Sequence, residues 1–217
     1  MKSLLVIGIG RFGYHLIDQL SKAGDEILAV DSSEERIEPI LGMVTSSLIG
    51  DTTNESFVRS LGVENFDVCF VAIGDDFQAS LETTSLLKEC GARYVVARAS
   101  RSVHEKFLLR NGADAVVFPE KQLAEWAAIR WCSGRVIDYL DYPGDFSIFE
   151  IEVPKSWIGK SLAELSIRNK LHLNVLSIRR DSKQIVEFPA DFIFETGDTV
   201  TIFGADKDIK KSLNLNY

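Results

Sequence analysis

The sequence predicts an α/β protein: a Rossmann-type doubly wound parallel sheet followed by a second, small α+β domain. Three observations lead to this prediction. Short apolar runs alternate with amphipathic stretches over the first half of the chain, as in a parallel sheet with crossover helices. A glycine-rich turn follows the first apolar run, and from Phe146 onward the pattern changes to closely spaced strands. We expect the first domain to cover residues 1–138 and the second to cover residues 139–217.

Six apolar runs of strand length should form the first sheet, and six is the strand count of a complete dinucleotide-binding fold. They are Leu4–Ile7, Ile27–Val30, Val44–Ile49, Val68–Ala72, Tyr94–Ala97 and Ala115–Phe118. Residues that can cap the intervening helices at their N-termini are Ser32 with Glu35, then Asp75 or Asp76, then Ser102. Gly91 and Gly112 stand where two of these helices should end.

After the sixth run, Glu120–Arg135 has helical periodicity, and Asp138–Asp145, which contains Pro143 and Gly144, is expected to be a linker. The second domain is expected to contain a helix near Leu162–Lys170 and another after Asp206. Its expected strands are Phe146–Val153, Asn174–Arg180, Ile185–Phe188 and Thr199–Phe203.

Composition and charge exclude several classes of protein. The chain has 24 Lys+Arg against 32 Asp+Glu, a net charge of -8, so we expect no binding to nucleic acid, whose phosphates require basic surfaces. No apolar run approaches the roughly 18 residues of a membrane span. Met1-Lys2-Ser3 leads directly into the first apolar run, so we expect a first strand instead of a signal peptide, and a cytoplasmic protein. The widely spaced Cys69, Cys90 and Cys132 are expected to be buried free thiols.

The segment Gly8-Ile9-Gly10-Arg11-Phe12-Gly13 follows a predicted strand and opens a predicted helix, as the dinucleotide-binding fingerprint requires. Its first glycine permits a tight turn, its second lets a diphosphate approach the backbone, and its third lets the helix pack on the strand. The helix N-terminus offers N–H groups to phosphates. Asp31 ends the second strand, where a carboxylate accepts hydrogen bonds from ribose hydroxyls and repels a 2′-phosphate. The pair predicts an adenosine nucleotide: NAD, ADP or ATP.

The identity of the nucleotide depends on Arg11. An arginine at this place can reach a terminal phosphate through charge-assisted hydrogen bonds, or it can remain solvated on the first helical turn. Groups for catalysis are scarce, because the three histidines are isolated and the sequence has neither an HExxH nor a Ser/His/Asp pattern. We therefore expect a protein that is not an enzyme, with an NAD-dependent oxidoreductase as the alternative. A redox-sensing transcription regulator would need a basic recognition helix, which this acidic chain lacks.

Eight segments carry a resemblance to a known family: GIGRFG at 8–13, LAVD at 28–31, GDTT at 50–53, VAIGDD at 71–76, TTSLLKE at 83–89, GAD at 112–114, FPEKQLAEW at 118–126 and FETGDTVTIFG at 194–204. Together they resemble the cytoplasmic regulatory subunits of Trk/Ktr potassium uptake systems, which have an RCK N-terminal (KTN) domain followed by an RCK C-terminal domain. The resemblance covers essentially the whole chain.

The resemblance implies a binding site for ATP/ADP or NAD(H), in which Arg11 meets the γ-phosphate of ATP. The residues it assigns are Gly8, Gly10, Arg11, Phe12 and Gly13 on the turn; Asp31, Ser32 and Ser33 at the ribose; Asp51 and Thr52 at the adenine edge; Ile73, Gly74 and Asp75 under the nucleotide; and Arg98, Ala99, Ser100 and His104 on the phosphate side. Glu120 matches a family carboxylate that helps to hold Mg²⁺ or Ca²⁺ between paired subunits, although a charge at a helix N-terminus is also favoured by the dipole alone.

In the second domain, Arg168 and Asn174 match positions that contact cyclic di-AMP in some relatives, and His172 stands where those relatives often have glycine. The alternative is a dimerisation module with an exposed Arg168. The resemblance further implies a cytosolic nucleotide-sensing gating subunit, a homo-oligomer whose dimers assemble into an octameric ring docked under a membrane potassium-translocating subunit. The helix over Glu120–Arg135 would carry the nucleotide-dependent conformational change to the subunit interface. Trp126 and Trp131 would be either exposed at that interface or ordinary core residues.

Overall fold

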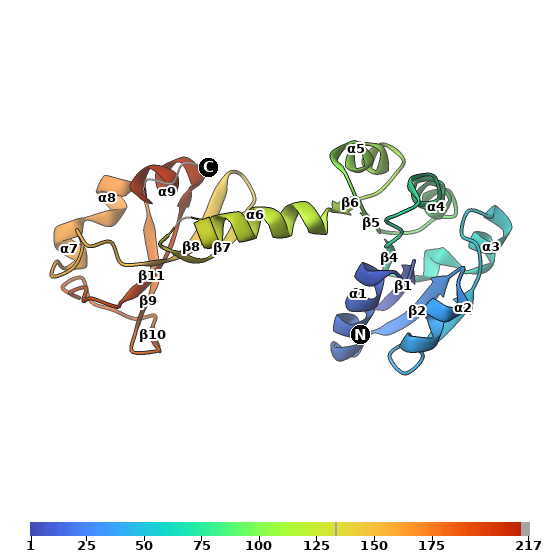
Figure 1. Cartoon of the computed structure of the whole chain (residues 1–217), viewed down its shortest axis with the longest axis horizontal. Coiled ribbons are helices and arrows are strands. Elements are labelled where there is room, and N and C mark those ends of the chain that lie inside the picture. Colours follow the sequence, from blue (N-terminus) through green and yellow to red (C-terminus); the bar gives the residue numbers. More distant parts are fainter. Residues whose placement is uncertain (133, 214–217) are drawn as a thin grey trace. The chain divides into compact units, whose positions relative to one another are not determined.

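The computed structural model describes residues 1–132 and 134–213. The chain divides into two compact units, Met1–Lys121 and Gln122–Tyr217, each with its own sheet (Figure 1). The boundary between the units lies after Lys121, earlier in the chain than the domain boundary expected after residue 138. The reason is that helix α6 (Pro119–Cys132) contributes Ile129 to the core of the second unit. Among the described residues, no helix is both long and apolar enough to cross a lipid bilayer.

The first unit contains a six-stranded parallel sheet in the order β3-β2-β1-β4-β5-β6, which confirms the predicted doubly wound sheet. Its strands are β1 (Ser3–Ile7), β2 (Glu26–Asp31), β3 (Ser46–Ile49), β4 (Val68–Val71), β5 (Val95–Arg98) and β6 (Ala115–Val117). The strand order reverses between β1 and β4, and ligands of such sheets bind in the crevice at the carboxyl ends of these strands.

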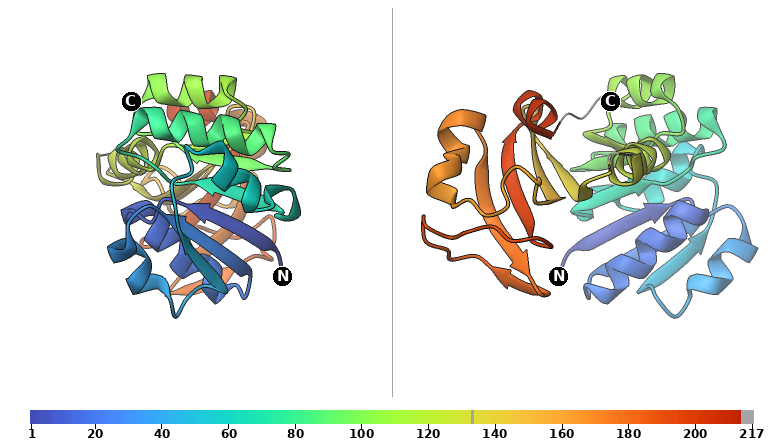
Figure 2. Two further views of the ribbon diagram at one scale, coloured as in Figure 1. Left: turned by 90° about the vertical axis from the view of Figure 1, so that its right-hand side faces the viewer. Right: turned by 60° about the vertical axis from the view of Figure 1, so that its left-hand side comes forward.

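Helices cover both faces of this sheet (Figure 2). They are α1 (Arg11–Lys22), α2 (Glu34–Ile37), α3 (Glu55–Ser60), α4 (Phe77–Glu89) and α5 (Ser102–Arg110), with short 3₁₀ helices η1 (Glu38–Ile40) and η2 (Val63–Asn65). Successive side chains of β1 enter opposite cores: Leu5 packs with Leu87 and Leu108, and Val6 packs with Ile17. Strands β1 and β2 are largely buried on both faces, which is why their sequences are nearly continuous apolar runs, whereas the edge strand β3 is mostly exposed.

The helix boundaries confirm some of the predicted caps and contradict others. Asp76 caps α4 by accepting a hydrogen bond from the backbone N–H of Ala79 at 2.9 Å, and Gly91 and Gly112 follow α4 and α5 with φ of 91° and 104°, as predicted. The Ser32–Glu35 capping box is wrong, because α2 begins one residue later and its N-cap Ser33 makes no side-chain cap bond. Ser102 is not a cap either, since it is already the first residue of α5.

The second unit contains an antiparallel sheet in the order β10-β9-β11-β8-β7, with helices packed against its buried face. The elements are β7 (Val136–Tyr142), β8 (Phe146–Glu152), α7 (Leu162–Leu165), α8 (Ile167–Leu171), β9 (Asn174–Arg180), β10 (Lys183–Ile185), β11 (Thr199–Ala205) and α9 (Asp206–Leu213). The small α+β module is therefore confirmed.

Three details of this unit differ from the prediction. The expected linker at 138–145 is most of β7 and the turn of the β7–β8 hairpin. Apart from the half-buried Tyr139 its side chains are exposed, so the segment lacks an apolar pattern. The strand expected at Ile185–Phe188 lies at Lys183–Ile185. The single helix expected over Leu162–Lys170 is two short helices, because Ser166 between them adopts a left-handed conformation with φ of 49°.

Helix α6 buries none of its residues completely. Trp131 is 73% exposed and therefore is not a core residue, whereas Trp126 is half-buried and donates its indole N–H to Asp138 at 2.9 Å. The three cysteines are free thiols, as predicted, and burial raises the pKa of Cys69 to about 12. Cys132 is exposed, so the expectation that all three are buried is wrong.

Candidate functional site

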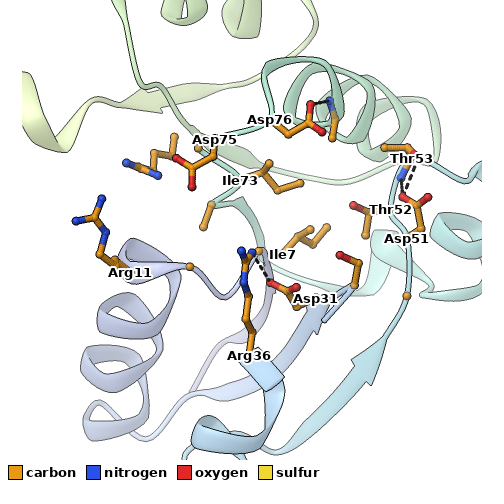
Figure 3. A pocket seen from close by; sticks show the side chains of 18 residues that line it. Ile7, Arg11, Asp31, Arg36, Asp51, Thr52, Thr53, Ile73, Asp75 and Asp76 are labelled. Carbon is orange, nitrogen blue, oxygen red and sulfur yellow. Dashed lines mark hydrogen bonds and ion pairs between the residues drawn. The ribbon is translucent and has the colours of Figure 1, made fainter. Parts of the chain in front are cut away.

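A pocket of about 240 Å³ lies in the first unit where the strand order reverses, at the carboxyl ends of β1, β2 and β4 (Figure 3). Eleven of the residues assigned from the sequence line it: Gly8, Gly10, Arg11, Asp31, Ser32, Asp51, Thr52, Ile73, Gly74, Asp75 and Arg98. The lining also includes residues that sequence reasoning missed: Ile7, Arg36, Gly50, Thr53, Ala72, Asp76 and Ala79. Most of the missed residues neighbour a predicted one in sequence, whereas Arg36 enters from helix α2.

Two glycines of the first turn are required by the fold itself. Gly8 has φ of 90°, and a Cβ there would lie 2.9 Å from the backbone nitrogen of Ile73. Gly13 is buried on the first turn of α1, and a Cβ there would lie only 2.1 Å from the carbonyl oxygen of Gly8. These glycines allow the chain to reverse and the helix to lie directly on the turn, with or without a ligand.

Gly10 is different, because nothing in the described structure requires a glycine there. Its φ is -74°, which any residue adopts, and a Cβ would meet no atom within 4 Å. Gly10 is the N-cap of α1, and the first turn of α1 contains no acidic side chain to offset the positive end of the helix dipole. The open space therefore indicates a place where an anion can approach the backbone closely.

Asp31 lies at the end of β2 and is 5% exposed. Its Oδ2 accepts a hydrogen bond from the backbone N–H of Ile9 at 2.6 Å, and its Oδ1 accepts one from Ser33 at 2.9 Å. Because a carboxylate has about four acceptor positions, Asp31 retains capacity for ribose hydroxyls. The bond to Ile9 also ties the end of β2 to the glycine turn, so Asp31 organises the pocket as well as facing it.

The residues assigned to the adenine edge, Asp51 and Thr52, both line the pocket but have separate environments. The N–H and hydroxyl of Thr53 donate to Asp51 Oδ1 and lower the pKa of the Asp51 carboxyl. Thr52 is 5% exposed, and its hydroxyl lies 2.8 Å from that of Thr83 on α4. Thr52 therefore anchors the loop after β3 to α4, and Asp51 faces solvent beside it.

Arg98 extends from the end of β5 across Gly74, where a Cβ would lie 1.7 Å from its Nη1. Its Nη2 donates to Glu120 Oε1 at 2.5 Å, at the start of α6. Burial opposes the ionisation of Glu120, but backbone and Arg98 hydrogen bonds together with the charges of Arg98 and Arg11 outweigh it and lower the pKa. Glu120 thus lies beside the cationic side of the pocket and is held there by Arg98.

The remaining assigned residues are outside the pocket lining: Phe12, Gly13, Ser33, Ala99, Ser100, His104 and Glu120. His104 is fully buried on α5, with its ring centroid 4.8 Å from that of Phe77. Burial and the charges of Arg101 and Arg98 lower its pKa, so it is a neutral packing residue at pH 7. Ala99 is also fully buried, and Ser100 contacts the His104 ring at 3.4 Å.

The metal expectation rests on Glu120 alone. In the part of the chain that the structure describes, no group of three or more His, Cys, Asp or Glu side chains is arranged to hold a metal ion. Glu120 could therefore supply one oxygen ligand, and the other ligands would have to come from phosphates, water or a second chain.

In the second unit, Arg168 and Asn174 line one pocket of about 430 Å³ between α7, α8 and β9. The other lining residues are Leu162, Ala163, Ser166, Ile167, Asn169, Leu173, Val175 and Ala190. His172, the C-cap of α8, has φ of 57°, which is a conformation that glycine adopts more easily.

A pocket at the reversal of strand order, formed by a glycine turn, a helix N-terminus and a buried carboxylate, defines a Rossmann-type nucleotide-binding protein. Residues 4–119 match the TrkA-N domain, and residues 147–215 match the TrkA-C domain. The chain belongs to the TrkA family, in which the nucleotide-binding fold precedes this second domain.

Relatives of nearly the same length support this assignment. The chain is 36% identical to Ktr system potassium uptake protein C of Bacillus subtilis over 97% of this chain and 95% of the relative, and 34% identical to protein A of that system over 98% and 96%. Among solved structures, the GsuK channel bound to NAD matches 95% of this chain and 38% of its own, with a TM-score of 0.66 and 17% identity. That likeness shows the fold.

Proposed function

We propose that this chain is a nucleotide-sensing regulatory subunit of a potassium uptake system, with an adenine nucleotide bound in the pocket of the first unit. The observation that carries the proposal is the open space at Gly10, which neither the backbone nor the packing explains. The relatives named potassium uptake proteins support the physiological setting, and the solved structures of GsuK bound to NAD and bound to ADP support the ligand class.

The subunit acts by changing shape and makes no bond. A ligand shifts a conformational equilibrium only by its differential affinity for the two states, so ATP must favour one state and ADP or NAD(H) another. Arg11 is the discriminating residue, because a triphosphate supplies additional charge beyond the diphosphate. Glu120 takes part by binding Mg²⁺ or Ca²⁺ together with phosphate oxygens, which requires that the Arg98 hydrogen bond to Glu120 be released or shared.

In this proposal the subunits form dimers that assemble into an octameric ring beneath the membrane potassium-translocating subunit, on the cytoplasmic side. Helix α6 supports assembly, because Leu123 and Trp131 are 64% and 73% exposed on a helix that buries none of its residues completely. The net charge of -8 excludes general attraction to anionic lipid, so the ring must dock through specific contacts with its partner.

Titration of the purified protein with ATP, ADP, NAD and NADH tests the proposal. Since the Arg11 guanidinium should lie near the terminal phosphate, we expect Arg11→Ala to weaken ATP binding by about tenfold or more and ADP binding by less than about threefold. Calorimetry measures both affinities. Arg59→Ala is the matched control, because Arg59 is an exposed arginine on α3 that pairs with Glu55 outside the pocket.

Equal affinities for all four nucleotides, unchanged by Arg11→Ala, would exclude sensing of the γ-phosphate. Turnover of NADH by the purified protein would instead favour the NAD-dependent oxidoreductase.

We also propose a second ligand site, for cyclic di-AMP, in the pocket of the second unit. The pocket observed at Arg168 and Asn174 favours it, because it combines a cation, an amide and an apolar wall suited to phosphate and base. Paired second units would enclose the ligand between them.

We expect Arg168→Ala to weaken cyclic di-AMP binding by about tenfold or more, since a charged hydrogen bond to phosphate is lost. Calorimetry with the full chain measures this, and Lys170→Ala, an exposed cation on the same helix, is the control. Equal weakening by both variants would indicate general attraction to a polyanion and not a defined site.

A further inference from the structure

Arg36 is the pocket residue that the sequence did not assign and that has the most direct bearing on which nucleotide can bind. It lies on α2, which follows β2, and its guanidinium stands beside the carboxylate at the ribose position (Figure 3). The Nη1 of Arg36 lies 3.7 Å from Asp31 Oδ2. This is an ion-pair distance but is too long for a hydrogen bond, so the N–H donors of Arg36 are not consumed by Asp31.

The same geometry weakens the repulsion that Asp31 exerts on an anion. Asp31 is buried and already accepts hydrogen bonds from the backbone N–H groups of Ile9 and Ser33. The positive guanidinium of Arg36 then offsets its charge from the open side. A carboxylate at this position repels a 2′-phosphate, and the positive charge of Arg36 at 3.7 Å reduces that repulsion.

Arg36 also has freedom to move toward a ligand. Its side chain is 57% exposed, and among the described residues Asp31 is the only carboxylate within ion-pair distance of it. The planar guanidinium presents two parallel donors that match two phosphate oxygens. In Rossmann-type folds an acidic residue at the end of the second strand binds the ribose 2′-hydroxyl of NAD, whereas an arginine near this position accommodates the 2′-phosphate of NADP.

We propose that Arg36 extends the specificity of the site to adenine nucleotides that carry a phosphate on the ribose 2′-oxygen, the class that includes NADP(H). The inference rests on the proposed function of the same pocket, since it requires an adenine nucleotide with its ribose at Asp31. The site then distinguishes nucleotides at two separate positions, with Arg11 at the terminal phosphate and Arg36 at the ribose.

Parallel titrations of the full-length protein with NAD, NADP and ATP test this inference, because NAD and NADP differ only in the 2′-phosphate. We expect the affinity of the wild-type protein for NADP to lie within about tenfold of its affinity for NAD. Arg36→Ala should weaken NADP binding by about tenfold or more and change NAD binding by less than about threefold. Arg36→Lys keeps the charge but loses the paired donors, so its affinity for NADP should lie between that of wild type and that of Arg36→Ala. Arg59→Ala is the control, since its side chain is 59% exposed and pairs with a carboxylate outside the pocket.

Three outcomes would overturn the inference. If wild-type protein binds NAD or ATP but binds NADP more than about a hundredfold more weakly than NAD, Asp31 still excludes the 2′-phosphate and the proposed function stands. If Arg36→Ala weakens the binding of NAD and of NADP equally, Arg36 contacts a group of the nucleotide that both ligands share. If none of the three nucleotides binds, the proposed function fails together with the inference.

Discussion

Replacing Gly13 by alanine should unfold much of the first unit, with a loss of about 3 kcal/mol or more in its free energy of unfolding. The added Cβ would lie 2.1 Å from the carbonyl oxygen of Gly8, and backbone cannot yield as a flexible side chain can. Because all three tryptophans lie in the second unit, fluorescence would not detect this change. Hydrogen exchange of peptides from 1–121, supported by circular dichroism, is the appropriate measurement.

Gly10→Ala is the matched control on the same turn. Its Cβ would meet no protein atom within 4 Å, so we expect its stability to lie within about 0.5 kcal/mol of wild type. The methyl group would nevertheless occupy the space in front of the helix N-terminus, so nucleotide binding should be lost. A Gly10→Ala protein that binds ATP normally would remove the main support for the proposed function, and a stable Gly13→Ala protein would contradict the packing argument.

We expect the second large loss of stability from a substitution at Asp198 in the second unit. Its carboxylate is 2% exposed and accepts two hydrogen bonds from Arg180, Nε at 2.7 Å and Nη2 at 2.6 Å, and one from the backbone N–H of Glu195. Asp198→Ala would remove the buried partner of Arg180, which is 26% exposed and still pairs with Glu195, so we expect the loss of these charged hydrogen bonds to cost about 1.5–3 kcal/mol. Urea unfolding followed by tryptophan fluorescence, to which the buried Trp157 contributes, reports on this core.

The same ion pair makes the second unit sensitive to acid. Burial opposes the ionisation of Asp198, but the hydrogen bonds and charge of Arg180 outweigh it, so its pKa lies below the ordinary value of 3.8. A lowered pKa means that the stabilisation is present above the unfolded-state pKa and is lost as the pH falls through the folded-state pKa. We therefore expect the free energy of unfolding of the wild-type unit to fall below about pH 4, and that of Asp198→Ala to fall less.

The exposed pair of Arg59 and Glu55 provides the contrast. Both side chains are more than half exposed, so Glu55→Ala should cost about 0.5 kcal/mol. If Asp198→Ala costs no more than Glu55→Ala, or if acid affects wild type and Asp198→Ala equally, the Arg180–Asp198 pair does not hold the second unit together.

Much of the first unit is predictable from local sequence. The central strands β1 and β2 are largely buried on both faces and must be apolar, so continuous apolar runs predicted them, although the edge strand β3 is mostly exposed. A glycine that no side chain can replace predicted the turn at Gly8. In the second unit one face of the sheet is exposed to solvent, so apolar and polar residues alternate along its strands. No continuous apolar run therefore marks these strands in the sequence. The segment at 138–145 was accordingly taken for a linker, although it forms part of a hairpin.

In the candidate site, too, some features follow from local sequence and others from tertiary packing. Local sequence patterns predict the class of fold, the glycine turn and Asp31, because these depend on backbone conformation and on residues adjacent in the chain. Three other features follow from tertiary packing: His104 faces the core, Arg98 holds Glu120, and Arg36 stands beside Asp31. The direction of a helical side chain depends on how its helix packs against the sheet, and that packing is set by contacts between residues that are distant in sequence.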